Sequence, residues 1–198
     1  LTSVPVLNTV HGTLDKRIIP NDVYRTFKHF REQNFTSISD FQRHHAPYLK
    51  WIGTVYNGIE VKNFPFNDNP RGSYALWVGR FTKTKAPHLA IRYARLAGLP
   101  LKMAAKLDRH VPADVEYFNQ EIMPELKPGG AEWVGEVGHK EKAILYSNAL
   151  VFLNPIQWDE PFGLTVTESM ACGTPVVAYR RGSMNELITD GETGFLIR

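Results

Sequence analysis

Residues 150–179 read LVFLNPIQWDEPFGLTVTESMACGTPVVAY, and their pattern indicates the fold class. The stretch opens with LVFLN at 150–154, an apolar run that ends in Asn154, and closes with the apolar run PVVAY at 175–179. Between the two runs, a loop rich in proline and charge leads into a helical sequence at 164–171. Continuous apolar strands separated by helices are typical of a parallel sheet that helices cover on both faces. We therefore predict a strand–helix–strand unit here.

The same alternation extends along the chain on both sides of this unit. The other predicted strands are 74–78, 101–105, 133–134 and 194–197. The other predicted helices are 87–97, 115–126, 141–147 and 184–188. We therefore predict an α/β fold with a nearly complete, doubly wound domain over residues 73–198.

The first third of the sequence does not form a complete domain of its own. It predicts strands at 4–9 and 35–38 and helices at 22–32 and 41–50. Two or three strands are too few for an independent α/β domain, so residues 1–58 are expected to be the end of a second one. Residues 59–72, rich in asparagine, proline and aspartate, have no helical period and are expected to link the two. The chain is thus expected to be a fragment.

Composition excludes several classes of protein. Of 198 residues, 43% are hydrophobic and 22% charged, which excludes a disordered or collagen-like chain. No apolar run reaches the ~18 residues of a spanning helix, and the first ten residues do not resemble a signal peptide. One cysteine, Cys172, excludes an internal disulfide framework and favours a reducing, cytoplasmic compartment. We interpret Cys172 as a small core residue.

The net charge of +3 comes from the first 72 residues, which hold nine Lys and Arg against six Asp and Glu. This excess suits an acidic substrate or peripheral contact with an anionic membrane, such as the inner membrane face, although a solvated surface is the plainer interpretation. Basic residues do not cluster with aromatic ones, so nucleic acid is not expected as a partner. Adjacent His44 and His45 face apart on a helix, and no spacing of His, Cys and Asp predicts a metal site.

Ligands of doubly wound sheets bind beyond the carboxyl ends of the strands, so residues that follow strands are the candidates for function. Gly79, Arg80 and Lys85 follow the strand at 74–78 and precede a helix. Gly79 allows close backbone approach, and both cations can face one anion near the helix amino terminus. The alternative is a pair of solvated surface cations. The chain has no G-x-G-x-x-G and no P-loop sequence, so the main motifs that indicate a nicotinamide-dependent enzyme or a P-loop enzyme are absent.

A second candidate site follows the strand at 150–154. Glu160 lies in the loop, Gly163 and Leu164 open the next helix, and Glu168 lies about one and a half turns into it. Free N–H groups at the helix amino terminus make an anion site, and a carboxylate accepts hydrogen bonds from sugar hydroxyls. The alternative is an acid near a helix amino terminus followed by a solvated helical glutamate. The first interpretation suits a ligand with diphosphate and polyol parts.

These motifs together resemble family 4 of the glycosyltransferases, the retaining nucleotide-sugar enzymes of the GT-B fold with two Rossmann-like domains. The matching stretches are VYNGI (55–59), VGR (78–80) with Lys85, WVG (133–135), EPFGL (160–164) with Glu168, GTPVVA (173–178) and GETGFL (191–196). The resemblance covers nearly the whole chain, and two glutamates separated by seven residues are its most specific part. Ala86 and Ala105 depart from the family pattern, which often has glycine there.

The resemblance assigns roles to individual residues. It implies that Arg80 and Lys85 neutralise the leaving diphosphate and that Glu168 binds the ribose hydroxyls. Glu160 and the backbone of Phe162, Gly163 and Leu164 would surround the donor sugar and phosphate. His11 would face the donor sugar, Val134 would lie beside the nucleobase, and Lys106 is expected in the same cleft.

The reaction that this implies is transfer of a sugar from a nucleoside-diphosphate donor, a UDP or GDP sugar, to an acceptor. Arg80, Lys85 and the helix amino terminus should make a metal unnecessary, and no cofactor is expected. The acceptor, whether sugar, lipid or small molecule, stays open because the family's glycine-rich acceptor loop and its C-terminal helix are not in these 198 residues. The fragment itself is expected to be inactive.

Two alternatives remain. One is a non-catalytic nucleotide-sugar-binding module or degenerate relative, against which the presence of Arg80, Lys85, Glu160 and Glu168 argues. The other is a glycogen-phosphorylase-like enzyme, which lacks support because no lysine stands in a context suited to pyridoxal phosphate.

Overall fold

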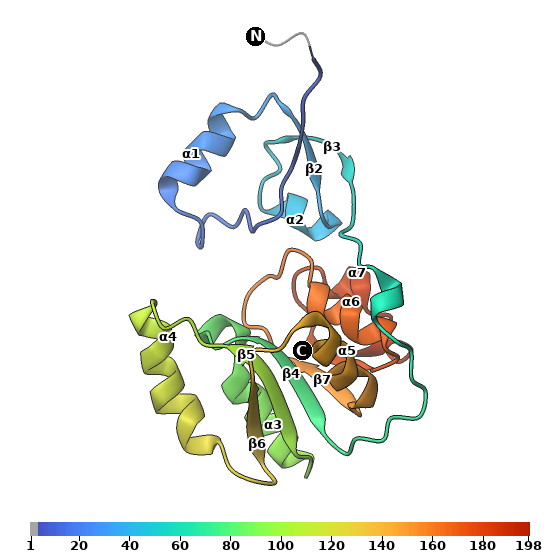
Figure 1. Cartoon of the computed structure of the whole chain (residues 1–198). Helices are drawn as coiled ribbons and strands as arrows, with labels where there is room; N and C mark the ends of the chain where they lie inside the picture. Colours follow the sequence, from blue (N-terminus) through green and yellow to red (C-terminus); the bar gives the residue numbers. More distant parts are fainter. Residues whose placement is uncertain (1–3) are drawn as a thin grey trace. The chain divides into compact units, whose positions relative to one another are not determined.

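The computed structural model describes residues 4–198, and the chain divides into two compact units (Figure 1). The first unit contains Leu1–Gly58 together with the short segments Asp159–Gly163 and Arg181–Glu186. The second unit contains Ile59–Trp158, Leu164–Arg180 and Leu187–Arg198. The expected boundaries placed the two short segments with the second domain, whereas their contacts group them with the first.

The second unit alternates strands and helices along the chain. Its strands are β4 (Ala75–Arg80), β5 (Leu101–Lys106), β6 (Ala131–Gly135), β7 (Val151–Asn154), β8 (Val176–Tyr179) and β9 (Gly194–Ile197). Its longer helices are α3 (Pro87–Leu96), α4 (Pro112–Tyr117), α5 (His139–Asn148) and α6 (Leu164–Ala171). The short helix α7 (Met184–Leu187) begins in one unit and ends in the other.

The six strands form one parallel sheet in the order β6-β5-β4-β7-β8-β9. Numbered within the unit, this order is 3-2-1-4-5-6, that of a doubly wound Rossmann-type sheet. The direction of winding reverses between β4 and β7, which pair through Ala75–Val151 and Leu76–Phe152. The predicted fold class is therefore confirmed, and the carboxyl ends of β4 and β7 define the switch point.

Aromatic packing anchors the carboxyl end of β4. Trp77 and Phe81 are each 1% exposed, and their rings stack with centroids 5.7 Å apart. Phe81 also contacts the rings of Phe118 and Trp133. Trp77 and Phe81 lie before and after Arg80 in the sequence, and their buried rings hold the end of β4 in place. The exposed Arg80 therefore projects from a rigid strand end.

The first unit holds a three-stranded parallel sheet in the order β1-β2-β3. Its strands are β1 (Leu7–Thr9), β2 (Asn34–Ser37) and β3 (Lys50–Thr54), and its helices are α1 (Asn21–His29) and α2 (Asp40–His44). Leu14, Phe35 and Leu49 belong to its buried apolar cluster. The Ser39 hydroxyl accepts a hydrogen bond from the Gln42 N–H and caps α2.

The structure corrects three sequence predictions. The predicted helix at 41–50 ends at His44, because Pro47 cannot continue it, and β3, which was not predicted, follows. The predicted helix at 115–126 becomes α4, a π turn at Phe118–Ile122 and a 3-10 turn at Met123–Glu125, where Pro124 lacks an N–H donor. The expected linker contains a 3-10 turn at Val61–Asn63.

Within residues 4–198, no helix combines the length and the apolar composition that crossing a bilayer requires.

Candidate functional site

A pocket of about 270 Å³ lies at the switch point of the second unit. It is lined by Trp77, Val78, Gly79 and Arg80 of β4, by Lys85, by Asn154 at the end of β7, by Ile156, and by Thr165 of α6. These residues come from the carboxyl ends of two neighbouring strands and from the helix that follows one of them. The pocket thus occupies the position where doubly wound sheets bind their ligands.

The turn after β4 brings Lys85 back to the pocket. The Thr82 hydroxyl and carbonyl oxygens both accept a hydrogen bond from the Lys85 N–H, at 3.3 and 3.2 Å, which closes a 3-10 turn. Ala86 then has φ 51°, a left-handed conformation that costs about 1–2 kcal/mol for a residue with a Cβ. Pro87 starts α3. Ala86 stands where the family often has glycine, and the turn still forms but carries this strain.

Lys85 lies against an aromatic ring. Its ammonium nitrogen is 5.4 Å from the centre of the Trp158 ring, within the range of a cation–π interaction. The Trp158 indole N–H is buried and has no hydrogen-bond partner among residues 4–198. The ring therefore orders a half-buried lysine beside the pocket.

The amino terminus of α6 also opens at the pocket. Thr165, the second residue of α6, lines the cavity, and the first residues of an eight-residue helix leave their N–H groups without partners inside the helix. Their positive partial charge adds to the charges of Arg80 and Lys85. Fixed charges and N–H groups of this kind suit a phosphate-containing anion.

Glu168 is buried, contrary to the alternative of a solvated helical glutamate. It is 7% exposed, and its Oε1 accepts a hydrogen bond from Lys142 Nζ of α5 at 2.7 Å. Glu168 follows Thr165 by three residues, so the two share one face of α6. The carboxylate therefore lies one turn beyond the residue that lines the pocket.

Glu160 lies in the first unit, where its main chain is tied to the segment Arg181–Glu186. The Glu160 carbonyl accepts a hydrogen bond from the Ser183 N–H at 3.0 Å. The single proton of the Ser183 hydroxyl is shared between the carbonyls of Glu160, at 3.0 Å, and Phe162. Gly182 has φ 56°, and a Cβ there would come within 2.5 Å of the Glu160 carbonyl oxygen. Gly182 and Ser183 thus shape the EPFG loop, a role that the sequence reasoning missed.

His11 is exposed in the loop after β1 of the first unit. Its neighbours are fixed by Gln42, whose Nε2 donates to the carbonyls of Val10 and Gly12 at 3.0 and 2.7 Å. Gln42 is 1% exposed, and its Oε1 accepts from the Ile38 N–H at 2.9 Å. The backbone on both sides of His11 is therefore held by a buried amide.

Val134 and Lys106 lie at the carboxyl ends of β6 and β5, outside the lining of the switch-point pocket. Val134 is half-buried, and Lys106 is exposed with its Nζ 4.0 Å from a carboxylate oxygen of Glu136. Their predicted roles beside the donor stay predictions.

Three side chains far apart in the sequence meet in the first unit. Ligand-type atoms of Asp15, His45 and Asp159 lie within 4.8 Å of one another. Hydrogen bonds from Arg17 lower the pKa of Asp15 to about 2, and Arg181 Nε lies 4.0 Å from Asp159. The two guanidinium groups already balance the carboxylates, so we interpret the cluster as an ion-pair network rather than a metal centre.

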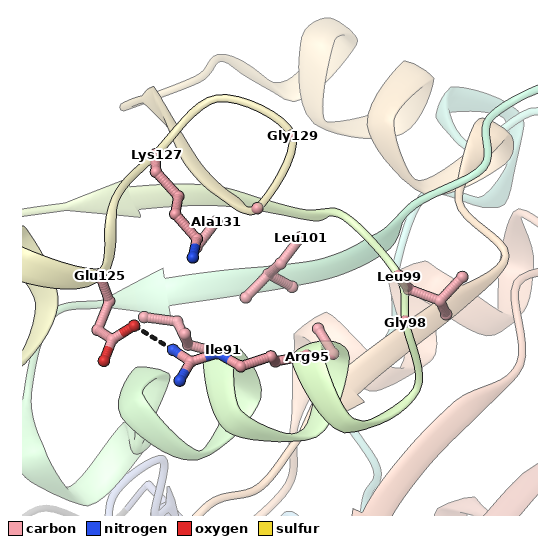
Figure 2. Close-up of a pocket in the computed structure, with 11 residues that line it drawn as sticks. Ile91, Arg95, Gly98, Leu99, Leu101, Glu125, Lys127, Gly129 and Ala131 are labelled. Carbon is pink, nitrogen blue, oxygen red and sulfur yellow. Dashed lines mark hydrogen bonds and ion pairs between the residues drawn. The ribbon is translucent and has the colours of Figure 1, made fainter.

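A second pocket of the second unit, of about 240 Å³, lies at the opposite ends of the strands, where β5 and β6 begin (Figure 2). Leu101 and Ala131, the first residues of β5 and β6, line it together with an ion pair between Arg95 and Glu125. It contains none of the site residues predicted from the sequence. Its position at the amino ends of the strands separates it from the switch point.

Comparison with solved structures supports the same architecture. A sucrose-phosphate synthase from Thermosynechococcus elongatus superposes with a TM-score of 0.80 at 21% identity, over 96% of this chain and 54% of that one. The Anabaena protein HepE, crystallised with UDP and glucose, gives a TM-score of 0.81 at 18% identity, over 98% of this chain and 57% of that one. Both similarities are similarities of fold, and they confirm the predicted GT-B architecture.

Among curated proteins, a glycogen synthase of Mycobacterium tuberculosis is 30% identical over an alignment 157 residues long, which covers 75% of this chain and 36% of that protein. A D-inositol 3-phosphate glycosyltransferase of Kribbella flavida is 31% identical over an alignment 179 residues long, which covers 74% of this chain and 39% of that protein. The chain spans less than half the length of these relatives. The family model of the glycosyl transferases group 1 matches residues 59–198. The chain therefore belongs to the group 1 glycosyl transferases.

Proposed function

We propose that this chain carries the donor site of a retaining glycosyltransferase, which moves a sugar from a nucleoside-diphosphate sugar to an acceptor. The observation that carries the proposal is the convergence of Arg80, Lys85 and the amino terminus of α6 on one pocket at the switch point. Two cations and a helix amino terminus suit an anion with two phosphates. The complex of HepE with UDP and glucose makes UDP the first candidate nucleotide.

The pocket's charges suit the difficult part of the reaction. As the bond between the anomeric carbon and the diphosphate oxygen breaks, its electrons pass to that oxygen, whose negative charge grows. Arg80 offers a fork of N–H donors, and Lys85 offers a compact charge. Because these groups are already in place, they stabilise the growing charge without reorganising. We propose that this potential makes a divalent metal unnecessary for departure of the diphosphate.

The remaining roles belong to the same proposal. Glu168 binds the ribose, and Val134 lies beside the base. His11, Glu160 and the backbone of residues 162–164 contact the donor sugar. Departure of the diphosphate and attack of the acceptor take place on one face of the sugar, which retains the configuration at the anomeric carbon.

The acceptor class stays open among sugars, lipids and small molecules. The basic excess of residues 1–72 suits peripheral contact with an anionic membrane face, and the single cysteine suits the cytoplasm. The membrane contact and the cytoplasmic location are therefore part of what we propose.

Calorimetric titration of the 198-residue chain with UDP, GDP, ADP and the parent nucleosides tests the proposal. At least one diphosphate should bind, and its nucleoside should bind at least ~100-fold more weakly, because each charge-assisted hydrogen bond contributes about 1.5–3 kcal/mol. Failure of all three diphosphates to bind, or equal binding of diphosphate and nucleoside, contradicts it.

A further inference from the structure

Glu168 belongs to a buried cluster between α5 and α6 that the proposed donor chemistry does not by itself explain. The side chains of Lys142 and Glu168 are only 16% and 9% exposed, and their ion pair joins Nζ to Oε1 at 2.7 Å. The second carboxylate oxygen, Oε2, is closed to water. The hydroxyl of Tyr146, which lies one helical turn after Lys142, is buried as well and faces the Glu168 carboxylate.

Stability alone does not account for this cluster. Removing two charges from water is costly, and apolar side chains of similar volume often serve a core equally well or better. Closing the second carboxylate oxygen to water adds to this cost. A buried charge pair one helical turn from a pocket is a candidate for a functional role.

Lys142 is the cation that pairs with the Glu168 carboxylate in this setting. Two other titratable groups respond to the Glu168 charge, and both are neutral near pH 7. Burial, the Glu168 charge and a hydrogen bond to Glu168 raise the pKa of Tyr146 well above its usual value. Burial and the Glu168 charge raise the pKa of Cys172 to about 11. Neither group can compensate the carboxylate, so the charge of Lys142 is needed.

The position of Glu168 on α6 relates the cluster to the switch-point pocket. Thr165 lines the pocket, and Glu168 lies three residues later on the same helix face. Oε1 is occupied by Lys142, whereas Oε2 retains its accepting capacity. A ligand hydroxyl that enters beside Thr165 would donate a hydrogen bond to Oε2 once the side chains that cover Oε2 move.

We propose that Lys142 is a positioning residue for recognition of the donor ribose, an inference that rests on the proposed function. Lys142 fixes the rotamer of Glu168 by holding Oε1, and it leaves Oε2 to accept a hydrogen bond from a ribose hydroxyl. Lys142 itself does not contact the donor. Its loss should therefore remove ribose recognition while leaving the diphosphate contacts of Arg80 and Lys85 in place.

The readout is the ratio of two affinities: that of the best-binding nucleoside diphosphate and that of its 2′,3′-dideoxy analogue. The wild-type chain should prefer the ribonucleotide by ~10-fold or more, as expected for a hydrogen bond to a charged group. Lys142→Met and Glu168→Gln should each lower this ratio to within ~3-fold of one, with little change in the affinity for the dideoxy ligand. Lys142→Arg, which keeps the cation, should restore most of the ratio.

Lys140→Met is the matched control, because Lys140 is exposed on the same helix two residues earlier. It should leave both affinities unchanged. Lys142→Gln is the second variant: it keeps an N–H donor for Oε1 and should fold even if Lys142→Met does not, and it should lower the ratio at least ~3-fold.

The outcomes separate this inference from the function on which it rests. A folded Lys142→Met or Lys142→Gln chain with the wild-type ratio, beside a Glu168→Gln chain that has lost it, overturns the inference and leaves the donor site standing. A wild-type chain that binds no nucleoside diphosphate overturns the proposed function and, with it, this inference.

Discussion

The ammonium group of Lys85 lies 5.4 Å from the centre of the Trp158 ring, so one of the two cations of the switch-point pocket is ordered by an aromatic face. The two residues come from different elements, Lys85 from the turn after β4 and Trp158 from the loop after β7. The turn before α3 and the loop before α6 thus meet through this contact.

This contact predicts the effect of replacing Trp158. Trp158→Leu should weaken nucleoside diphosphate binding by ~3–10-fold, because a cation–π interaction of about 0.5–2 kcal/mol no longer orders Lys85. Trp158→Phe should retain part of the affinity. Calorimetry of both variants, with circular dichroism to confirm folding, measures the effect, and an unchanged affinity in Trp158→Leu would show that the ring does not contribute.

The EPFG loop should depend on Gly182. In Gly182→Ala, a Cβ would come within 2.5 Å of the Glu160 carbonyl oxygen, in a backbone conformation that already disfavours a side chain. We expect a loss of more than 2 kcal/mol in the free energy of unfolding, on the order of an overpacked site with added backbone strain.

Gly191→Ala is the matched control for this prediction. Gly191 has φ 85°, but a Cβ there meets nothing within 4 Å, so only the backbone strain of about 1–2 kcal/mol applies. Urea unfolding of both variants separates strain from collision. Equal losses would mean that the EPFG loop moves away from position 182 without cost.

Asp15 should make the stability of the first unit dependent on pH. Hydrogen bonds from Arg17 lower its pKa from an ordinary value near 3.8 to about 2 in the folded chain. A lowered pKa stabilises the folded state above the unfolded pKa, and this stabilisation is lost as the pH falls from about 4 to 2.

Asp15→Asn checks this sign. The variant should be less stable by about 1–2 kcal/mol at pH 7, a value that allows for screening by water around the exposed Arg17. The difference from wild type should shrink below pH 4. Thermal melts at pH 7, 4 and 3 measure it, and a difference that stays constant with pH would assign the effect to packing.

The sequence predicted the sheet because its strands carry their own signal. Residues 150–154 and 175–179 are continuous apolar runs, and the helix between them begins and ends where the pattern does. Strand β3, in contrast, reads KWIGT, with polar residues at both ends, and becomes a strand by pairing with β2. Local pattern does not contain that information.

Some residues of the candidate site were likewise predictable from the sequence, and others were not. Gly79, Arg80 and Lys85 were predicted because they follow a strand, and they line one pocket. The partner of Glu168 was not predicted, since Lys142 lies 26 residues away on another helix. The cluster of Asp15, His45 and Asp159 joins residues still farther apart. Such contacts depend on how elements pack, for which a single sequence carries no spacing signal.

We propose that Arg80 and Lys85 bind a diphosphate at the carboxyl ends of the strands. The affinity of the best-binding nucleoside diphosphate for Arg80→Ala, Lys85→Ala and Arg95→Ala tests this role. Arg95 is the control because it pairs with Glu125 at the opposite ends of the strands (Figure 2). Arg80→Ala and Lys85→Ala should each weaken binding by ~10–100-fold, and Arg95→Ala should not change it. An affinity within ~3-fold of wild type in both Arg80→Ala and Lys85→Ala, with folding intact, would contradict the proposal.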